Sequence, residues 1–397
     1  MDASSGGGEV FLVFLKLGLT SFGGPVAHLG YFREEFVIRR KWLDEHAYAD
    51  LVALCQFLPG PASSQVGLAV GLSRAGYLGA LAAWIGFTLP SALALVVFAL
   101  GVAAVGGADG SAWLHGLKVA AVAVVAQAVL GMMRSLAPDK ERATLAVAAA
   151  AIALAFPSAW GQVSAIALGA VAGITLLRTT APSDHVSLPL VVSRTAGAAA
   201  LILFFALLIG LPLLASQTAN QAVHLVDAFY RAGSLVFGGG HVVLPLLQAE
   251  VVPVGWVTND QFLAGYGAAQ AVPGPLFTFA AYLGAVIGGW GIAALCLVAV
   301  FLPSFLLVIG ALPFWEETRS KASAQSALRG VNAAVVGLLL AALYNPVWTA
   351  GITSTKDFAL AIAAFLLLYM WQTTPWLVVI LSAVGASLMA LLPAWVF

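Results

Sequence analysis

Two Pro-Gly-Pro triplets, Pro59-Gly60-Pro61 and Pro273-Gly274-Pro275, interrupt long apolar stretches of this sequence. Proline suits the first position of a helix, where the N–H groups have no partner inside the helix. Those donors, together with the positive end of the helix dipole, favour a bound anion. We therefore expect each triplet to precede a helix whose start can hold an anion. A break made only for packing is the alternative.

Glycine runs add a second pair of candidate anion contacts. Gly23-Gly24 and Gly238-Gly239-Gly240 can adopt left-handed backbone angles and let an anion approach the main chain. Hydroxyl and amide donors near the triplets are Gln56, Ser63, Ser64, Gln270 and Thr278. The two glutamines can equally serve as packing amides.

Two cations stand at matching distances before the glycine runs. Lys16 and Arg231 each precede their glycines by seven residues. A cation within a membrane segment is costly and is by default a functional hypothesis. Two fixed positive charges would suit a compact dianion. The alternative is that they extend to the membrane surface or pair with Glu9 and Asp227.

Four titratable residues near these motifs are candidates for proton coupling. Glu35 and Glu250 occupy matching places after the two glycine runs, and His28 and His241 lie close to the same glycines. Histidine titrates near neutral pH, which suits such a role. The alternative for Glu35 is an ion pair at the membrane surface, because basic residues surround it.

The composition places these motifs in a membrane. The chain has 397 residues, 61% hydrophobic and 9% charged, and a mean hydropathy of +1.00. Soluble domains carry about 25% charged residues, so soluble and disordered classes are excluded. Seventeen basic and seventeen acidic residues leave no net charge for binding nucleic acid. No hydrolase, ATPase or metalloprotease motif and no Cys/His cluster occurs. We therefore expect no enzyme, no metal and no cofactor.

The apolar stretches indicate helices. They are continuous Ala/Leu/Val blocks without the period-two alternation of a barrel, and several exceed the roughly 20 residues of a span. The charge-free stretches are 75–108, 143–177, 196–215, 261–315, 330–355 and 358–397. The stretch 143–177 is long enough for two spans folded at 157–161. The expected fold class is an all-α polytopic membrane protein with broken helices.

The sequence contains an internal repeat. Matched blocks are Phe14–Gly24 with Phe229–Gly239, Trp42 with Trp256, Gln56–Pro61 with Gln270–Pro275, Leu89-Pro90-Ser91 with Leu302-Pro303-Ser304, and Leu117-Lys118 with Leu328-Arg329. Their order is the same in both halves, which indicates two homologous units. We expect a first repeat at 1–180, a linker with a connecting helix at 181–219, and a second repeat at 220–397.

The basic residues predict that the two repeats are inverted. Segment 25–43 holds Arg33, Arg39, Arg40 and Lys41, whereas its counterpart 240–257 has no Lys or Arg. The reverse holds for 103–117, whose counterpart carries Arg319 and Lys321. Because positively charged short loops stay in the cytoplasm, opposite insertion of the repeats follows, as in many secondary transporters.

This topology predicts re-entrant hairpins. If Arg74 is cytoplasmic, 44–73 must enter and leave on one side as two helices of about 14 residues, ~20 Å each. Its tip would be Pro59–Pro61. Segments 9–24 and 25–40 would form a second hairpin with its tip at Gly23-Gly24-Pro25. A single kinked span in either place is the alternative.

These motifs resemble the chromate ion transporter family in its long, two-domain form. The resemblance rests on Phe22-Gly23-Gly24-Pro25, Gln56–Pro61, Phe237–His241 and Gln270–Pro275, and covers nearly the whole chain. It implies export of chromate from the cytoplasm across the bacterial inner membrane, and so chromate resistance, with sulfate as a competitor. It also implies that Lys16, Phe22–Pro25, Pro59–Pro61 and Arg231 matter. Gly240 replaces Pro25 in the second repeat, so the two tips need not be equivalent.

Several functions fit these residues. A secondary transporter would move chromate by alternating access, driven by the proton motive force or by anion exchange. Sulfate or another oxyanion is an alternative cargo, because tetrahedral dianions of similar size present the same acceptors. An anion channel is a further alternative. The sequence leaves open the physiological anion, the direction, the coupling ion, the stoichiometry and the oligomeric state, including a homodimer.

Overall fold

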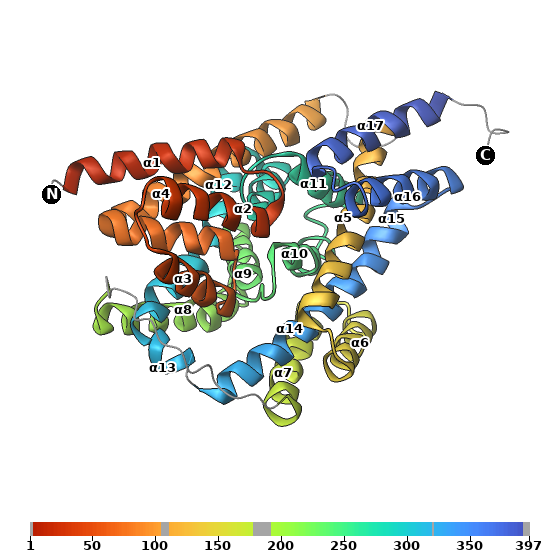
Figure 1. Cartoon of the computed structure of the whole chain (residues 1–397). Coiled ribbons are helices and arrows are strands. Elements are labelled where there is room, and N and C mark those ends of the chain that lie inside the picture. The colour runs from red at the N-terminus through yellow and green to blue at the C-terminus, as the bar shows by residue number, and fades with distance from the viewer. Residues whose placement is uncertain (1–2, 105–110, 178–191, 320, 392–397) are drawn as a thin grey trace.

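The computed structural model describes residues 3–104, 111–177, 192–319 and 321–391. Within them the chain consists of α-helices with short 3₁₀ and π segments and contains no strand (Figure 1). Six of these helices are long and apolar enough to cross a membrane. The expected all-α, multi-spanning fold is confirmed. The predicted boundary at residue 180 and part of the predicted loop 103–117 lie outside the described residues.

The described residues of the first half and the connecting helix form nine segments. They are α1 (Ala3–Thr20), α2 (Gly24–Arg33), η1 (Glu34–Arg39), α3 (Glu45–Phe57), α4 (Ala62–Ala104), α5 (Ala112–Leu136), α6 (Lys140–Ala155), α7 (Ala159–Leu176) and the connecting α8 (Arg194–Ala215). The predicted fold of 143–177 into two helices is confirmed, because the chain leaves the helix between α6 and α7.

The second half repeats this plan with more short segments. They are α9 (Gln221–Ser234), η2 (Gly240–Val242), α10 (Val243–Val251), α11 (Asn259–Ala271), η3 (Leu276–Thr278), α12 (Phe279–Ala311), η4 (Leu312–Phe314), α13 (Trp315–Arg319), α14 (Ala322–Ala342), η5 (Leu343–Trp348), α15 (Thr349–Gly351), α16 (Thr355–Tyr369) and α17 (Pro375–Leu391).

Helices are interrupted at each of the four predicted places. The breaks cover 21–23, 58–61, 235–239 and 272–275. The Pro-Gly-Pro triplets lie wholly in these breaks, and each glycine run ends at the first residue of the next helical segment, Gly24 of α2 and Gly240 of η2. After the first triplet an α-helix starts at Ala62, whereas the second triplet is followed by the 3₁₀ segment η3. The prediction of broken helices is therefore confirmed in both halves.

Side-chain caps start the short helices that precede the triplets. The Asp44 carboxylate accepts a hydrogen bond of 2.8 Å from the Ala47 N–H at the start of α3. Thr258 and Gln261 form a reciprocal capping box at the start of α11. Such caps satisfy donors that have no partner within the helix.

The long helices α4 and α12 each bend sharply one third of the way along. The bends fall at Ala75-Gly76 and at Gly288-Gly289, which are matching places in the two repeats. A Cβ on Gly71 would collide with the backbone of Gly79. The absence of that atom lets the two segments on either side of the first bend pack closely. Residues 62–74 thus form a short helix of their own, as the predicted 44–73 hairpin requires.

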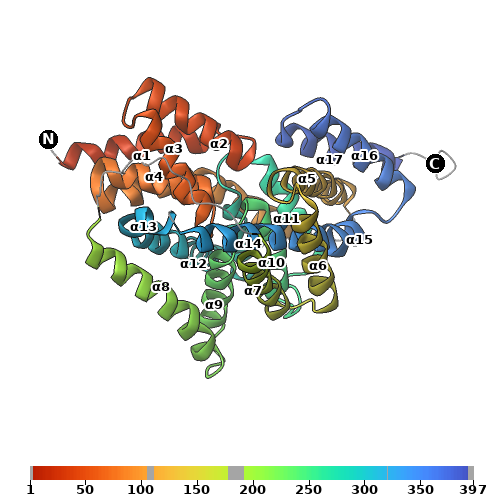
Figure 2. The same cartoon turned by 60° about the horizontal axis from the view of Figure 1, so that its bottom comes forward.

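The two halves interlock. α14 of the second half packs against α6, α7 and α5 of the first half, and α17 packs against α5. α4 and α12, one from each half, also contact each other. α14 and α7 can be followed side by side in both views (Figures 1 and 2). Small residues make this possible: Gly169, Gly173 and Gly330 bring the backbones of α7 and α14 together.

Candidate functional site

The helix breaks of one repeat are hydrogen-bonded to those of the other. The Gly60 N–H donates to the Val236 carbonyl oxygen at 2.6 Å, and the Gly274 N–H donates to the Ser21 carbonyl oxygen at 2.9 Å. Val236 and Ser21 directly precede the matching Phe-Gly-Gly runs. Each Pro-Gly-Pro triplet therefore lies against the glycine run of the opposite half. The four broken tips thus come together, as two repeats with re-entrant hairpins entering from opposite sides would predict.

Each triplet glycine also faces a serine of the opposite half. A Cβ on Gly60 would lie 2.7 Å from the Ser304 Oγ, and one on Gly274 would lie 3.0 Å from the Ser91 Oγ. These glycines have φ angles of +126° and +96°, which side chains rarely adopt. Ser91 and Ser304 occupy matching places in the repeat. The glycine of each triplet is thus required for two reasons: its positive φ angle, and the lack of space for a side chain beside the serine hydroxyl.

Several buried polar atoms near these tips have no hydrogen-bond partner among the described residues. Four of them can donate a hydrogen bond: the Oγ atoms of Ser21, Ser64 and Ser304 and the Nε2 of Gln270. The fifth, the Oε1 of Gln65, can only accept one. Leaving a buried polar group unpaired costs about 1–3 kcal/mol. Neutral O–H and N–H donors can form hydrogen bonds to an oxyanion. The tips therefore carry the donor chemistry of an oxyanion site.

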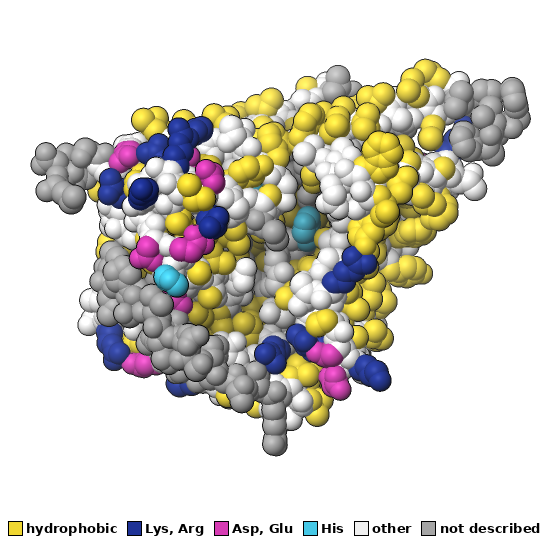
Figure 3. Space-filling model, viewed as in Figure 1, with side chains coloured by type: hydrophobic (Ala, Val, Ile, Leu, Met, Phe, Trp, Pro, Cys, Tyr) yellow, Lys and Arg dark blue, Asp and Glu magenta, His cyan; other side chains and the backbone are white. Residues whose placement is uncertain are grey.

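A cavity of about 680 Å³ lies beside the tips. Pro25, Gly60 and the pair Gly238-Gly239 form one part of its wall, and Gln56 of α3 and Asn332 of α14 extend it. Figure 3 shows a hollow in the middle of this face, between the elements that line the cavity. Its volume is within the range of about 300–1,000 Å³ found for small-molecule pockets. A tetrahedral oxyanion with some of its water fits inside.

Asp50 is the one charged residue among the described residues that line the cavity. The Trp315 indole N–H donates to its Oδ1 at 3.5 Å. An anion in this cavity would consequently be held by dipoles and would lie near a carboxylate. An acidic group inside a membrane protein is by default a functional hypothesis, yet the sequence reasoning overlooked this one.

The two predicted cations do not line the cavity. Lys16 is exposed on α1. Arg231 donates to both carboxylate oxygens of Glu250 at 2.8 Å and lies 3.1 Å from Asp227. Arg231 is thus neutralised by two carboxylates, which include the neighbour that the sequence offered as its alternative partner.

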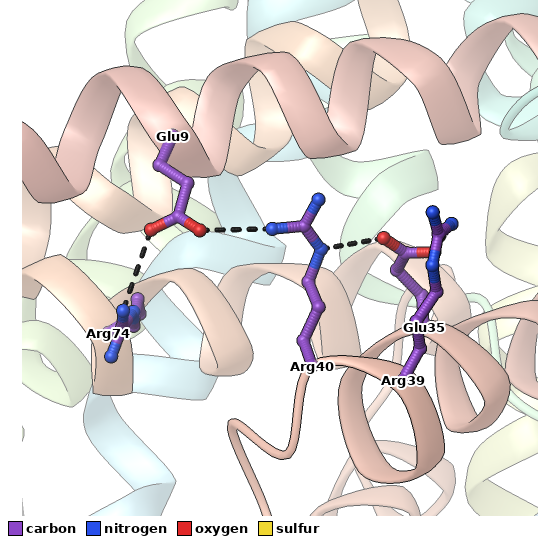
Figure 4. A network of polar contacts seen from close by, with 5 residues as sticks. All are labelled: Glu9, Glu35, Arg39, Arg40 and Arg74. Carbon is purple, nitrogen blue, oxygen red and sulfur yellow. Dashed lines mark hydrogen bonds and ion pairs between the residues drawn. The ribbon is translucent and has the colours of Figure 1, made fainter.

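In the first repeat the matching glutamate belongs to a larger network (Figure 4). Arg40 donates to Glu35 at 2.6 Å and to Glu9 at 2.9 Å, and Arg74 lies 3.5 Å from Glu9. Arg39 adds a second contact to Glu35 at 3.1 Å. This network joins α1, η1 and the first segment of α4. It places Glu35 and Glu9 among basic partners, as the ion-pair alternative describes.

The two histidines near the tips are engaged by neighbouring polar groups. The His28 ring contacts the Ser63 Oγ and the Ser21 carbonyl oxygen, both at 3.2 Å. The His241 Nδ1 lies 2.8 Å from the Tyr266 hydroxyl. His28 therefore connects α2 to the glycine break and to the start of α4, and includes the predicted site residue Ser63 in that connection.

The remaining predicted site residues divide between the cavity and the packed interior. The Phe22 ring packs near Trp376 of α17 at 6.0 Å between centroids. Pro61 and Pro275 are buried, and Pro59 and Pro273 are partly buried. Pro25 lies against Gly240, so the two glycine runs touch where their sequences differ.

Sequence reasoning missed Ser304, Ser91 and Asn332 as site residues. The two serines were recognised only as markers of the repeat, although matched hydroxyls inside apolar helices are a usable signal. The Asn332 Oδ1 is buried without a partner among the described residues, next to Gly238. A single asparagine in an apolar helix was the available signal for it.

Comparison with known proteins assigns the family. A family model described as chromate transporter matches residues 8–174 and 223–387, which contain all four tips. The chain belongs to the chromate transporter family. Members of this family are membrane transporters, not enzymes. The double match also confirms the two repeated halves.

Related proteins cover most of the chain. A chromate transport protein of Pseudomonas aeruginosa is 30% identical over 96% of this chain and 91% of its own length. A chromate transport protein of Cupriavidus metallidurans is 26% identical over 84% of this chain and 81% of its own. An uncharacterized transporter of Methanocaldococcus jannaschii is 27% identical over 95% and 92%. No solved structure matches the chain.

Proposed function

We propose that this chain carries chromate out of the cytoplasm across the bacterial inner membrane, by exposing a central oxyanion site to each side in turn. The observation that carries the proposal is the meeting of the four broken tips. Gly60 and Gly274 are hydrogen-bonded across the repeats, and an unpartnered Ser304 hydroxyl lies beside Gly60. The names of the related proteins support chromate as the cargo.

The site proposed here binds by dipoles rather than by salt bridges. Main-chain N–H groups at the tips, serine hydroxyls and glutamine amides donate to the four oxygens of the anion. Lys16 and Arg231 then act at a distance or in another conformation. Neutral donors hold a dianion without trapping it, which suits a carrier that must release its cargo. Sulfate offers the same acceptors and would compete.

The membrane potential alone can drive the proposed export. Moving one charge through 100 mV is worth about 2.3 kcal/mol, so a dianion leaving a negative interior releases about 4.6 kcal/mol. Anion exchange or proton coupling would add to this. His28, Glu35, His241 and Glu250 stay the candidates for proton coupling, and Asp50 in the cavity wall joins them.

Flux into proteoliposomes tests the proposal. We expect chromate uptake to saturate, to respond to an imposed membrane potential, and to be inhibited by excess sulfate. Ser304→Ala should raise the KM for chromate roughly tenfold or more, since a hydrogen bond to a charged group is worth about 1.5–3 kcal/mol. Ser164→Ala is the matched control, because that hydroxyl is exposed on α7 and bonds its own helix.

The same assay can contradict the proposal. An unchanged KM in Ser304→Ala would remove the serine from the site. Flux that never saturates would favour a channel. Sulfate transport without any chromate transport would assign a different cargo to the same tips.

A further inference from the structure

The two repeats pack differently at corresponding places. Ala53 of α3 is the counterpart of Gly267 of α11, and Leu328 of α14 is the counterpart of Leu117 of α5. Gly267 is pressed against α5, since a Cβ there would lie 2.5 Å from the Leu117 carbonyl oxygen. Ala53 and Leu328 instead both line the 680 Å³ cavity. The α11–α5 contact is closed, whereas the matching α3–α14 region is open.

An ion pair lies directly beside the closed contact. The Lys118 Nζ is 2.9 Å from the Asp260 Oδ1, and the pair joins α5 of the first repeat to the start of α11 in the second. The Lys118 side chain is only 14% exposed. In the repeat, Lys118 corresponds to Arg329, which is exposed, and Asp260 corresponds to His46, which is also exposed.

A second pocket of about 470 Å³ adjoins this pair. Lys118 and Asp260 line it together with Lys356 and the contacting pair His115 and Asp357. The charge distribution of the loops predicts that this pocket is on the outer side, whereas the cavity beside α3 and α14 is on the cytoplasmic side. The ion pair therefore lies on the side of the tips away from the open cavity.

We propose that Lys118 and Asp260 form the outer gate of the transporter, closed in this conformation. The inference rests on the proposed function, and it names the residues that must separate for the anion to leave. When the gate opens, the second repeat takes the arrangement of the first: α11 moves off α5 and Leu117 becomes exposed to the outer pocket. In the same movement α3 approaches α14, and Ala53 and Leu328 come together to close the cavity.

The strength of the pair suits a gate. An ion pair that remains partly exposed contributes at most about 1 kcal/mol, so breaking it shifts the balance between the two conformations about fivefold. Gly267 lets α11 pack closely against α5, and it has no side chain that would interlock with α5. The closed state is thereby favoured without being locked.

Cysteine labelling tests the gate independently of chromate flux. In a chain with Cys55 and Cys296 replaced by alanine, Leu117→Cys reports the outer side and Leu328→Cys reports the cavity. A membrane-impermeant maleimide is applied from one side of oriented vesicles, without substrate. We expect Asp260→Asn to speed labelling at position 117 from outside about fivefold and to slow labelling at position 328 from the cytoplasmic side. The swap Lys118→Asp with Asp260→Lys should restore both rates.

An ion pair at the start of a single helix, α6, supplies the control. Asp139→Asn breaks the pair of Asp139 with Arg142, which joins no second element, and should move neither rate. Unchanged labelling at position 117 in Asp260→Asn would overturn the gate. Faster labelling at 117 with an unchanged rate at 328 would also overturn it, because it would report local opening rather than an exchange of conformations. Opposite changes at the two positions in a chain that moves no chromate would keep the gate and refute the cargo.

Discussion

Replacing Gly60 with alanine tests whether the meeting of the tips carries the function. Gly60 has a φ of +126°, and its N–H is hydrogen-bonded to Val236 of the other repeat. An added methyl group would lie 2.5 Å from the Gln65 Nε2 and 2.7 Å from the Ser304 Oγ. Both neighbours are buried. The substitution therefore strains the backbone and displaces two site side chains at once.

The expected cost has two parts. An L-residue in a left-handed conformation costs roughly 1–2 kcal/mol. Displacing Gln65 breaks the 2.7 Å hydrogen bond from its Nε2 to the Pro59 carbonyl oxygen, worth about 1 kcal/mol. We expect Gly60→Ala to destabilise the protein by about 2–3 kcal/mol and to abolish most chromate uptake.

Two other glycines separate these parts. Gly24 has a φ of +77° but nothing within 4 Å of an added Cβ, so Gly24→Ala should cost only the backbone share. Gly131 lies inside α5 with an ordinary helical backbone and open space. Gly131→Ala should stabilise the protein by about 0.5–1 kcal/mol, because alanine has the higher helix propensity.

The assay is thermal unfolding in detergent, paired with chromate uptake after the same protein preparations are reconstituted into proteoliposomes. From most to least stable, the predicted order is Gly131→Ala, wild type, Gly24→Ala and Gly60→Ala. A Gly60→Ala protein as stable and active as wild type would refute the geometry of the tips. Normal stability with lost uptake would keep the site and reject the strain argument.

Two further predictions concern ion pairs. Arg231→Ala should destabilise the protein by about 3–5 kcal/mol, because it leaves the Glu250 and Asp227 carboxylates buried without their cation. Adding Glu250→Gln should recover part of that loss, and a stable double variant without uptake would show that Arg231 also contacts the anion. Asp357 is buried, which opposes its ionisation, but hydrogen bonds from Thr353 and Ser354 outweigh burial and hold the pKa of its carboxyl below its usual range. A carboxyl whose pKa is lower in the folded than in the unfolded chain stabilises the fold at pH values above the unfolded-state pKa. This contribution is lost as the pH falls toward the folded-state pKa. Asp357→Asn should therefore cost about 2 kcal/mol at pH 7, with a difference from wild type that narrows below about pH 4; a difference independent of pH in unfolding experiments would contradict this.

Local chemistry determined the helix breaks and the repeat. Two prolines and a glycine within three residues oppose the continuation of a helix, so Pro59–Pro61 and Pro273–Pro275 predicted breaks that the structure contains. Single prolines such as Pro90 and Pro303 stay inside long helices. Asp44 and Thr258 are residue types that favour helix starts, and each caps the helix that follows it, because a cap acts within its own turn. Helix breaks and helix caps depend on residues only a few positions apart in the chain, so they can be predicted from a single sequence.

Tertiary structure alone decided which polar groups share a site. Lys16 and Arg231 looked equivalent in the repeat, yet Lys16 is exposed and Arg231 is held by two carboxylates. Asp50 and Asn332 line the cavity because α3 of one half faces α14 of the other. In a membrane protein both the lipid-facing and the protein-facing sides of a helix are apolar, so periodicity does not reveal which side is buried. The interlocking of the two halves set those partners, and it depends on close glycine contacts between residues far apart in the sequence.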